Sequence, residues 1–460
     1  MAWSPRAMDL LHAVCILEAA GFGPALTGLL QDWVSFQMSD KRPVGYIEIL
    51  REYPTYRRYF VANAISMLGT WFSAIALFTL APVVSERPEL TIGVLMVLQM
   101  VALAFPQPFT GMLADRFNRK WLMVISEVAA ALLVLALMTI RGPEHIYLYY
   151  GGAALLMMLH ALYLPAESAA LPNIVPDEQA LLTANAMNSA TWSSCMAIGA
   201  ALGGFVVAGY GTDVAFVVDS ATFVLSALII VSLDIPQEGL NRATRNAQNG
   251  FRMIVEGFRR IRQTPPVYRI LSAKALWALG GGGLVYCLVM LGEELGLGEV
   301  AAGIGVVYAV RGLGSGLGPL VARFLLRDPV RWPFYLGALV SLSGVFYLGV
   351  GTMPWSVWVL GFVLAAHAAS GANWVLSTVI LQNRTTDEWR GRVFATDFLL
   401  MTLVNGLSSL LASLLLAYGF FELRSLILFF AGLQVFVGIL WLVLTLPGER
   451  REQALQAQAP

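Results

Sequence analysis

Arg311 is the residue of this 460-residue chain that is best placed to do chemistry. It stands in the middle of an apolar run from about 300 to 322. An ionisable side chain inside such a run is costly in a membrane and points to function. The glycines around it leave the backbone bare and deformable; they are Gly303, Gly305, Gly312, Gly314, Gly316 and Gly318. We expect Arg311 either to bind an anionic ligand or to pair with an acidic side chain.

Four other charged side chains lie inside apolar runs. Glu127 and Asp219 are each about two turns into a run, where structural pairing, snorkelling to the interface and proton binding all remain open. Lys274 is also about two turns in, and we expect it to reach the membrane surface. Asp397 is near the start of its run, where the positive end of a helix favours a carboxylate.

Uncharged polar residues complete the candidate site. His160 and His367 are placed in apolar runs, and histidine can exchange protons near neutral pH, although a neutral, hydrogen-bonded ring is commoner. Amide side chains offer further donors for a cavity wall; they are Asn63, Gln99, Gln107 and Asn405. Cys15, Cys195 and Cys287 show no metal-ligand spacing and are interpreted as small apolar fillers. We expect no metal and no cofactor.

These residues must be positioned by helices that cross a membrane. The chain is 58% hydrophobic and only 13% charged, against about 25% charged in a soluble domain. About twelve apolar runs are each long enough to cross a bilayer, which needs roughly 20 residues. They lie near 59–82, 91–113, 121–141, 146–165, 184–209, 214–234, 268–291, 300–322, 332–352, 355–380, 393–418 and 423–446. Pro106 and Pro108 should distort the second. The sequence therefore predicts an all-α membrane protein.

Charged residues in the loops predict the topology. Lys and Arg gather before the first span, in the middle linker, after spans two, eight and ten, and in the tail, whereas the other loops carry mostly acids. Because basic loops stay in the cytoplasm, we expect both termini there. The net charge of +0 gives no reason to expect a nucleic-acid partner. We expect a monomer that contacts lipids.

Two six-helix halves and a linker make up the expected domain organisation. The divisions are 1–50 (an N-terminal extension, either interfacial or an over-long reading frame), 51–235, the linker 236–266, 267–447 and the tail 448–460. The spacing of apolar residues in the linker predicts an amphipathic helix; they are Phe251, Ile254, Val255, Phe258 and Ile261. The halves look like repeats, because Gly111 and Gly318 begin similar stretches 207 positions apart and Asp177 and Asp387 stand 210 apart.

A short basic loop joins spans two and three. Gly111 lies near the end of its helix, where a missing side chain lets a neighbouring helix approach closely. Asp115 would then meet a cation or a helix N-terminus at that contact. The remaining residues of the stretch are Arg116, Asn118, Arg119 and Lys120, and the second-half copy has Ala322 in place of Asp115.

This stretch resembles the loop 2–3 signature of the major facilitator superfamily, G-x-x-x-D-R/K-x-G-R-R/K. Five residues match, and Asn118 replaces the second glycine. Asn tolerates a left-handed backbone, so the turn is expected to survive. The resemblance implies substrate binding between the halves and alternating access. It also implies that Asp115 closes the cytoplasmic side by meeting the start of span eleven and Arg390 or Arg392.

Further motifs resemble the bacterial enterobactin-exporter and macrolide-efflux branch over about residues 50–447. They are Gly69-Thr70-Trp71, Pro165-Ala166 with Leu171-Pro172, Thr183-Ala-Asn-Ala186, Val218-Asp-Ser-Ala221 and Arg390-Gly-Arg-Val-Phe394. Members of that branch are mostly exporters of siderophores, drugs or other amphipathic compounds, driven by proton exchange. The resemblance therefore implies a proton-coupled exporter in a bacterial inner membrane. A lipid or lysolipid carrier, a metabolite importer and a non-transporting sensor stay open, whereas no residue pattern indicates an enzyme.

Span five partly matches the antiporter signature G-x-x-x-G-P-x-x-G-G of such exporters. Gly199, Gly203 and Gly204 fit the pattern, but Ala200 replaces the proline and Cys195 the first glycine. Small residues at this spacing allow close helix packing in any membrane protein. Packing alone is therefore as good an explanation as export.

Overall fold

Helices form almost all of the structure. The computed structural model describes residues 44–236, 250–325 and 327–458, and these contain no β-strand. The helices of the N-terminal half are α3 (Tyr46–Glu52), α4 (Pro54–Val84), α5 (Pro88–Ala104), α6 (Gln107–Arg116), α7 (Arg119–Leu137), α8 (Ile146–Ile174), α9 (Glu178–Tyr210) and α10 (Thr212–Val231). Those that follow are α12 (Gly250–Gln263), α13 (Pro265–Glu294), α14 (Val300–Leu325), α15 (Trp332–Thr352), α16 (Val359–Asn383), α17 (Asp387–Ala417) and α18 (Leu423–Gln458).

Most of these helices are candidate membrane crossings. Eleven of the described helices are each long and apolar enough to span, and α5 with α6, which meet at a bend of 43°, count as a twelfth when they are taken as one broken span. The bend falls at Phe105 and Pro106, because proline has no backbone N–H to donate the hydrogen bond that would continue the helix. The predicted all-α, twelve-span fold is confirmed, including the distortion of span two.

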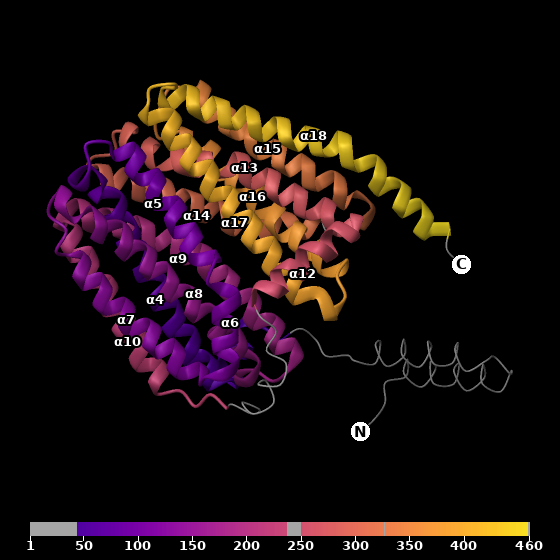
Figure 1. The fold of residues 1–460 in the computed structure, drawn as a ribbon, viewed down its shortest axis with the longest axis horizontal. Helices are drawn as coiled ribbons and strands as arrows, with labels where there is room; N and C mark the ends of the chain where they lie inside the picture. The colour runs from indigo at the N-terminus through magenta and orange to yellow at the C-terminus, as the bar shows by residue number, and fades with distance from the viewer. Residues whose placement is uncertain (1–43, 237–249, 326, 459–460) are drawn as a thin grey trace.

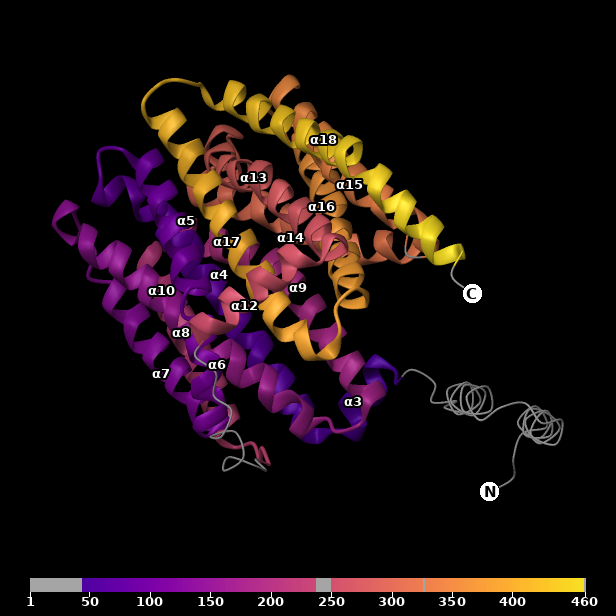
Figure 2. The ribbon, with the colours of Figure 1, turned by 45° about the vertical axis from the view of Figure 1, so that its right-hand side comes forward.

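The two halves lie side by side, as the colours of Figure 1 show. Contacts between them run mainly along two helix pairs, α9 with α14 and α5 with α17. The turned view in Figure 2 keeps α5 beside α17. Within each half, further pairs such as α4 with α10 and α15 with α18 complete the bundle.

Successive helices alternate in direction, so the connections gather at two ends of the bundle. We call the end that carries the α6–α7, α8–α9, α14–α15 and α16–α17 connections the basic end, because most loop cations lie there. The other end carries the α4–α5, α13–α14 and α17–α18 connections and is called the acidic end. Two close glycine contacts between the halves, Gly204 with Gly305 and Gly93 with Ser413, lie toward the acidic end.

Helix α12 occupies the linker between the halves. It packs against α17 of the second half and against α6 of the first. Ile261 is buried, whereas Val255 and Phe258 are half exposed; the side chains of Phe251 and Ile254 lie outside the described residues. Gly257 sits so close to α17 that a Cβ atom would lie 2.7 Å from the carbonyl oxygen of Arg392.

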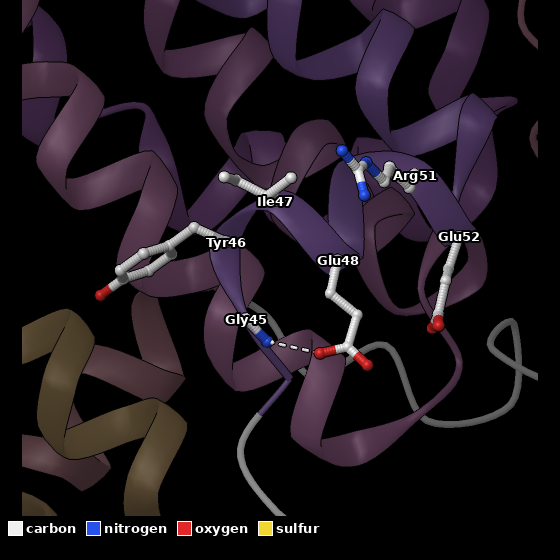
Figure 3. A pocket seen from close by; sticks show the side chains of 6 residues that line it. All are labelled: Gly45, Tyr46, Ile47, Glu48, Arg51 and Glu52. Atoms are coloured by element: carbon white, nitrogen blue, oxygen red, sulfur yellow. Dashed lines mark hydrogen bonds between the residues drawn. The ribbon is translucent and has the colours of Figure 1, made fainter.

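A short helix, α3, precedes the first crossing at the basic end. Figure 3 shows the side chains that line a hollow beside it, with the Glu48 carboxylate accepting a bond from the Gly45 amide at 3.1 Å. These six residues come from one segment, and none belongs to the interface between the halves. The expectation for residues 1–43 lies outside the described residues.

Candidate functional site

A buried carboxylate, Glu167, lies at the meeting point of three helices of the N-terminal half. It is only 6% exposed on α8. The Tyr59 hydroxyl and the Asn63 amide of α4 donate to its Oε1 atom, the amide at 3.2 Å. The Asn188 amide of α9 donates to the same oxygen at 3.4 Å. Among the described residues no cation pairs with it, so hydroxyl and amide dipoles alone stabilise a carboxyl group inside the membrane.

Sequence reasoning missed Glu167. The predicted span four ends at residue 165, whereas α8 continues through Pro165 and Pro172 to Ile174. A proline is tolerated within a membrane helix when a neighbour satisfies the carbonyl that loses its partner. Here the Thr110 hydroxyl of α6 donates to the Ala161 carbonyl, four residues before Pro165, at 2.7 Å. The small, apolar residues that flank Glu167 were the available signal that the span goes on.

Two further polar atoms beside Glu167 have no hydrogen-bond partner. They are the Tyr163 hydroxyl, one turn earlier on α8, and the Oδ1 atom of Asn188, and both are buried. His160 is half buried and lies seven residues before Glu167, hence on the same helix face. Buried polar groups are normally paired, so unpaired ones beside a carboxylate make this position a candidate ligand site.

Glu127 on α7 and Asp219 on α10 are both buried against α4. The Ser66 hydroxyl donates to Glu127 at 3.0 Å, and the Ser73 hydroxyl donates to Asp219. Glu127 is 4% exposed and Asp219 is fully buried, so neither snorkels to the interface. Neither forms a salt bridge within the described chain, so their structural partners are serine hydroxyls, and proton binding remains a prediction.

In the C-terminal half Lys274 and Asp397 form a buried ion pair. They lie on α13 and α17, and their side chains are 3% and 6% exposed. The Lys274 amine also lies 4.9 Å from the centre of the Trp374 ring. Both sequence predictions were wrong: Lys274 does not reach the surface, and Asp397 is not near a helix start, because α17 begins ten residues earlier.

Arg311 is half buried on α14, and the described residues include no acidic partner for it. Its guanidinium lies 5.1 Å from the centre of the Tyr308 ring, and its Nε atom is buried without a hydrogen-bond partner. Its positive charge also acts on Tyr347 and His367. The Tyr347 hydroxyl and the His367 Nε2 atom are hydrogen-bonded to each other at 2.8 Å. Of the two sequence expectations, pairing with an acid is therefore not observed.

Glycines bring the halves together toward the acidic end. A Cβ atom on Gly204 of α9 would lie 2.8 Å from the Cα of Gly305 on α14. Gly199 and Gly203 instead pack on α4, within the same half, against Trp71 and its neighbours. The glycines of span five therefore make two different contacts, with α4 inside the N-terminal half and with α14 of the other half. A pocket of about 300 Å³ remains at this end, lined by both halves, with Glu89, Glu293 and Glu299 among its residues.

Gln99 and Asn405 lie half buried along the second contact between the halves. Gly406, next to Asn405 on α17, packs on Val97 and Met100 of α5. Nearer the acidic end, a Cβ atom on Gly93 would overlap the Ser413 side chain. Gln99 and Asn405 are therefore carried by the two helices that form this contact, and their role in a cavity wall remains a prediction.

The loop between α6 and α7 is open in this conformation. Asp115 and Arg116 are exposed at the basic end. Nothing among the described atoms lies within 4 Å of a Cβ built on Gly111, so the expected close approach is absent where the halves are apart. Asn118 is not left-handed: its φ is −66°, and its side chain caps α7 by accepting from the Trp121 amide at 3.3 Å.

The other basic residues of this loop bind carbonyls within the same half. Arg119 donates to the Ala169 carbonyl of α8 and Lys120 to the Leu233 carbonyl after α10, both at 2.7 Å. The loop is thereby fastened to the helix that carries Glu167. Sequence reasoning assigned these cations to the gate but did not foresee this bracing role.

The expected partners of Asp115 are engaged elsewhere. Arg392 on α17 lies 3.6 Å from Glu256 of α12, and its guanidinium lies 4.7 Å from the centre of the Trp389 ring. Arg390 is half buried one turn from the start of α17. Neither contact with Asp115 is present in this conformation.

The sequence profile of the Major Facilitator Superfamily matches residues 59–310, which is more than half of the chain. The chain belongs to the major facilitator superfamily. It is a multi-pass membrane transporter of this superfamily rather than an enzyme. Among curated relatives, the MFS-type transporter YfiS of Bacillus subtilis is 24% identical over 347 residues, covering 72% of this chain and 80% of that protein. BacE of Bacillus subtilis, assigned as a bacilysin exporter, is 22% identical and covers 74% of this chain and 84% of its own.

Solved structures of other major facilitators share the fold. The nucleoside transporter NupG superposes with a TM-score of 0.65 at 12% identity, over 85% of this chain and 98% of that one. A bacterial homologue of the iron transporter ferroportin in an inward-facing state gives a TM-score of 0.64 at 14% identity, over 84% and 98%. At these identities the likeness concerns the fold alone.

Proposed function

We propose that this transporter is a proton-coupled exporter of a small amphipathic compound, in a bacterial inner membrane, working by alternating access. One observation carries the proposal: three carboxyl groups, at Glu127, Glu167 and Asp219, are buried in the N-terminal half with no cation paired to them among the described residues. A buried charge without a counter-charge is expensive, so such groups take up and release protons as their surroundings change.

Glu167 is the proton carrier among the three. Glu127 and Asp219 are enclosed between α4 and the neighbouring α7 and α10, by hydroxyl groups that stay with them. The donors to Glu167 come from α4 and α9, and α9 is also the helix that packs on the other half. Movement of the halves therefore changes the surroundings of Glu167 directly.

The basic end faces the cytoplasm in this proposal. The excess of Lys and Arg in its loops supports that orientation. Packing of Gly204 on Gly305 toward the acidic end, together with the exposure of Asp115, then corresponds to a state open to the cytoplasm. In the opposite state Asp115 meets the start of α17 and Arg392.

Export is the direction that the curated relative BacE favours, since that protein is assigned as an exporter. An importer or a lipid carrier would use the same fold. Direction therefore needs a flux measurement with a defined membrane orientation.

Flux into inside-out vesicles tests the proposal. Vesicles with an imposed pH gradient are offered fluorescent dyes, drugs and siderophores. We expect gradient-dependent uptake that is lost in Glu167→Gln and slowed in Asp115→Asn, while Glu294→Gln at the exposed acidic end keeps it. Uptake that ignores the pH gradient, or that survives in Glu167→Gln, contradicts proton coupling through this residue.

Spin labels report the gate separately. Labels at Leu182 on α9 and Leu320 on α14, both exposed near the basic end, measure the distance between the halves there. Asp115→Asn should lengthen the average distance by favouring the state open at the basic end. An unchanged distance distribution contradicts the gating role.

A further inference from the structure

Charge is divided unequally between the two halves. The N-terminal half holds a buried carboxylate without a cation at Glu167, and the C-terminal half holds a cation without an acidic partner among the described residues at Arg311. We propose that the cargo is amphoteric, with an ammonium group that binds at Glu167 and an acidic group that binds at Arg311. This inference rests on the proposed transport function and names its substrate class.

The surroundings of Glu167 offer acceptors. All three described donors, from Tyr59, Asn63 and Asn188, bind the Oε1 atom, so Oε2 accepts none of these bonds. The Oδ1 atom of Asn188 and the hydroxyl of Tyr163 are buried without partners beside it. These three acceptors equal in number the three N–H donors of a primary ammonium group.

Aromatic rings strengthen the same preference. Tyr59 and Tyr163 are 1% and 5% exposed, and both lie close enough to Glu167 to interact electrostatically. Ring faces attract cations, and the attraction grows where water is excluded. An anionic group would be repelled by the carboxylate, and an apolar group would leave the acceptors unpaired.

Arg311 offers donors. Its buried Nε atom has no partner, and its guanidinium is held over the Tyr308 ring without an acid. A guanidinium fits a carboxylate or phosphate with two parallel hydrogen bonds. Tyr308 also contacts the Trp71 ring of the N-terminal half at 5.8 Å between ring centres, so Arg311 lies close to the interface.

The two positions are separated along the bundle by a distance that a small molecule can bridge. Asn63 is eight residues toward the basic end from Trp71, and Arg311 is three residues toward it from Tyr308. Along α9, Asn188 is nine residues toward the basic end from Ala197, which packs on Gly312. Arg311 itself is one residue toward the acidic end from Gly312. At 1.5 Å per residue these offsets place the two groups about 8–15 Å apart in height.

A cargo with both charges engages both halves at once. A compound with only one charge binds one half and leaves the other charged group unpaired, so it gains less from closure. We therefore expect the transporter to discriminate against compounds that lack either charge.

Ciprofloxacin is a suitable probe, because it is a rigid, fluorescent, amphipathic zwitterion with an ammonium and a carboxylate at opposite ends. Its ethyl ester keeps only the cation and its N-acetyl form keeps only the anion. A phenylalanine-containing tripeptide, its methyl ester and its N-acetyl form make a second set. Binding is measured by thermal shift of the purified transporter and flux in inside-out vesicles.

We expect at least one zwitterion to bind and move about tenfold better than its two singly charged forms. Glu167→Gln should abolish the advantage over the N-acetyl form, and Arg311→Gln the advantage over the ester. Glu167→Asp keeps the charge and should retain part of the preference, which separates loss of charge from loss of folding.

The outcomes separate this inference from the proposed function. Equal binding of the singly charged forms in both sets overturns the amphoteric cargo. Gradient-driven flux of cationic dyes alone also overturns it while leaving proton-coupled export intact. A zwitterion that binds with the expected variant pattern but shows no flux supports the cargo class and contradicts the proposed function.

Discussion

The amine of Lys274 on α13 binds the carboxylate of Asp397 on α17 inside the C-terminal half, away from water. The pair joins two helices of one half rather than the two halves to each other. The described residues of the N-terminal half include no equivalent pair, because the buried carboxylates there have no cation. The buried Lys274 and Asp397 thus compensate each other within one half, whereas the described buried carboxylates of the other half are held by hydroxyl and amide groups.

Breaking the Lys274–Asp397 pair should destabilise the fold. Lys274→Met leaves a buried carboxylate without its cation, which costs about 3–5 kcal/mol, whereas replacing both residues by apolar ones is often nearly neutral. We expect the thermal midpoint in detergent to fall for Lys274→Met and to recover in Lys274→Met with Asp397→Leu. A double variant as unstable as the single one would mean that the pair does more than compensate charge.

A larger residue at Gly204 should open the acidic end. The Cβ atom alone would lie 2.6 Å from the Ala301 carbonyl oxygen, so Gly204→Leu forces α9 away from α14. A cysteine at Thr79, in the pocket at this end, should react roughly tenfold faster with an impermeant maleimide if the state open there gains about 1.4 kcal/mol. Gly209→Leu is the matched control, because nothing lies within 4 Å of its Cβ position on the same helix. Equal labelling of both variants would argue against this contact as the closure.

Glu256→Gln should favour closure of the basic end. Glu256 lies 3.6 Å from Arg392 with both side chains partly exposed, so the pair contributes about 0.2–1 kcal/mol. Without it, Arg392 is freer to meet Asp115, and the distance between labels at Leu182 and Leu320 should shift modestly toward shorter values. Arg259→Gln, exposed on the same helix, should have no effect. If Asp115→Asn does not cancel the shift, Arg392 is not the shared partner.

Gly69→Ala should lower the yield of folded protein. A Cβ atom there would lie 1.8 Å from the Thr222 hydroxyl and 2.8 Å from the Asp219 carboxylate. Overpacking of this kind costs about 1–3 kcal/mol. Gly151→Ala, which meets nothing within 4 Å, should be tolerated, and fluorescence size-exclusion profiles compare the two. A normal profile for Gly69→Ala would show that Asp219 can move aside.

Apolar length and loop charge were sufficient to predict the helices, because a bilayer sets how many apolar residues a crossing needs. The same criterion missed Glu167, because it predicted that the helix ends at Pro165. In the structure the helix continues, since the Thr110 hydroxyl binds the carbonyl that loses its partner at this proline. Lys274 and Asp397 are 123 positions apart in the chain, and no local pattern reports that their helices meet. We predicted that Asn118 would replace the glycine of the motif in a left-handed turn. Its side chain instead caps α7 by accepting a hydrogen bond from the Trp121 amide.

The hydrogen bond from Thr110 to the carbonyl of Ala161 also bears on how the protein is made. Because of Pro165, α8 leaves the ribosome with a backbone acceptor that its own chain cannot satisfy. The helix that supplies the missing donor, α6, is synthesised about fifty residues earlier and is already in the bilayer. Insertion of α8 is thereby tied to the order of translation: a chain rearranged so that α8 emerged first would expose this carbonyl to lipid until α6 arrived.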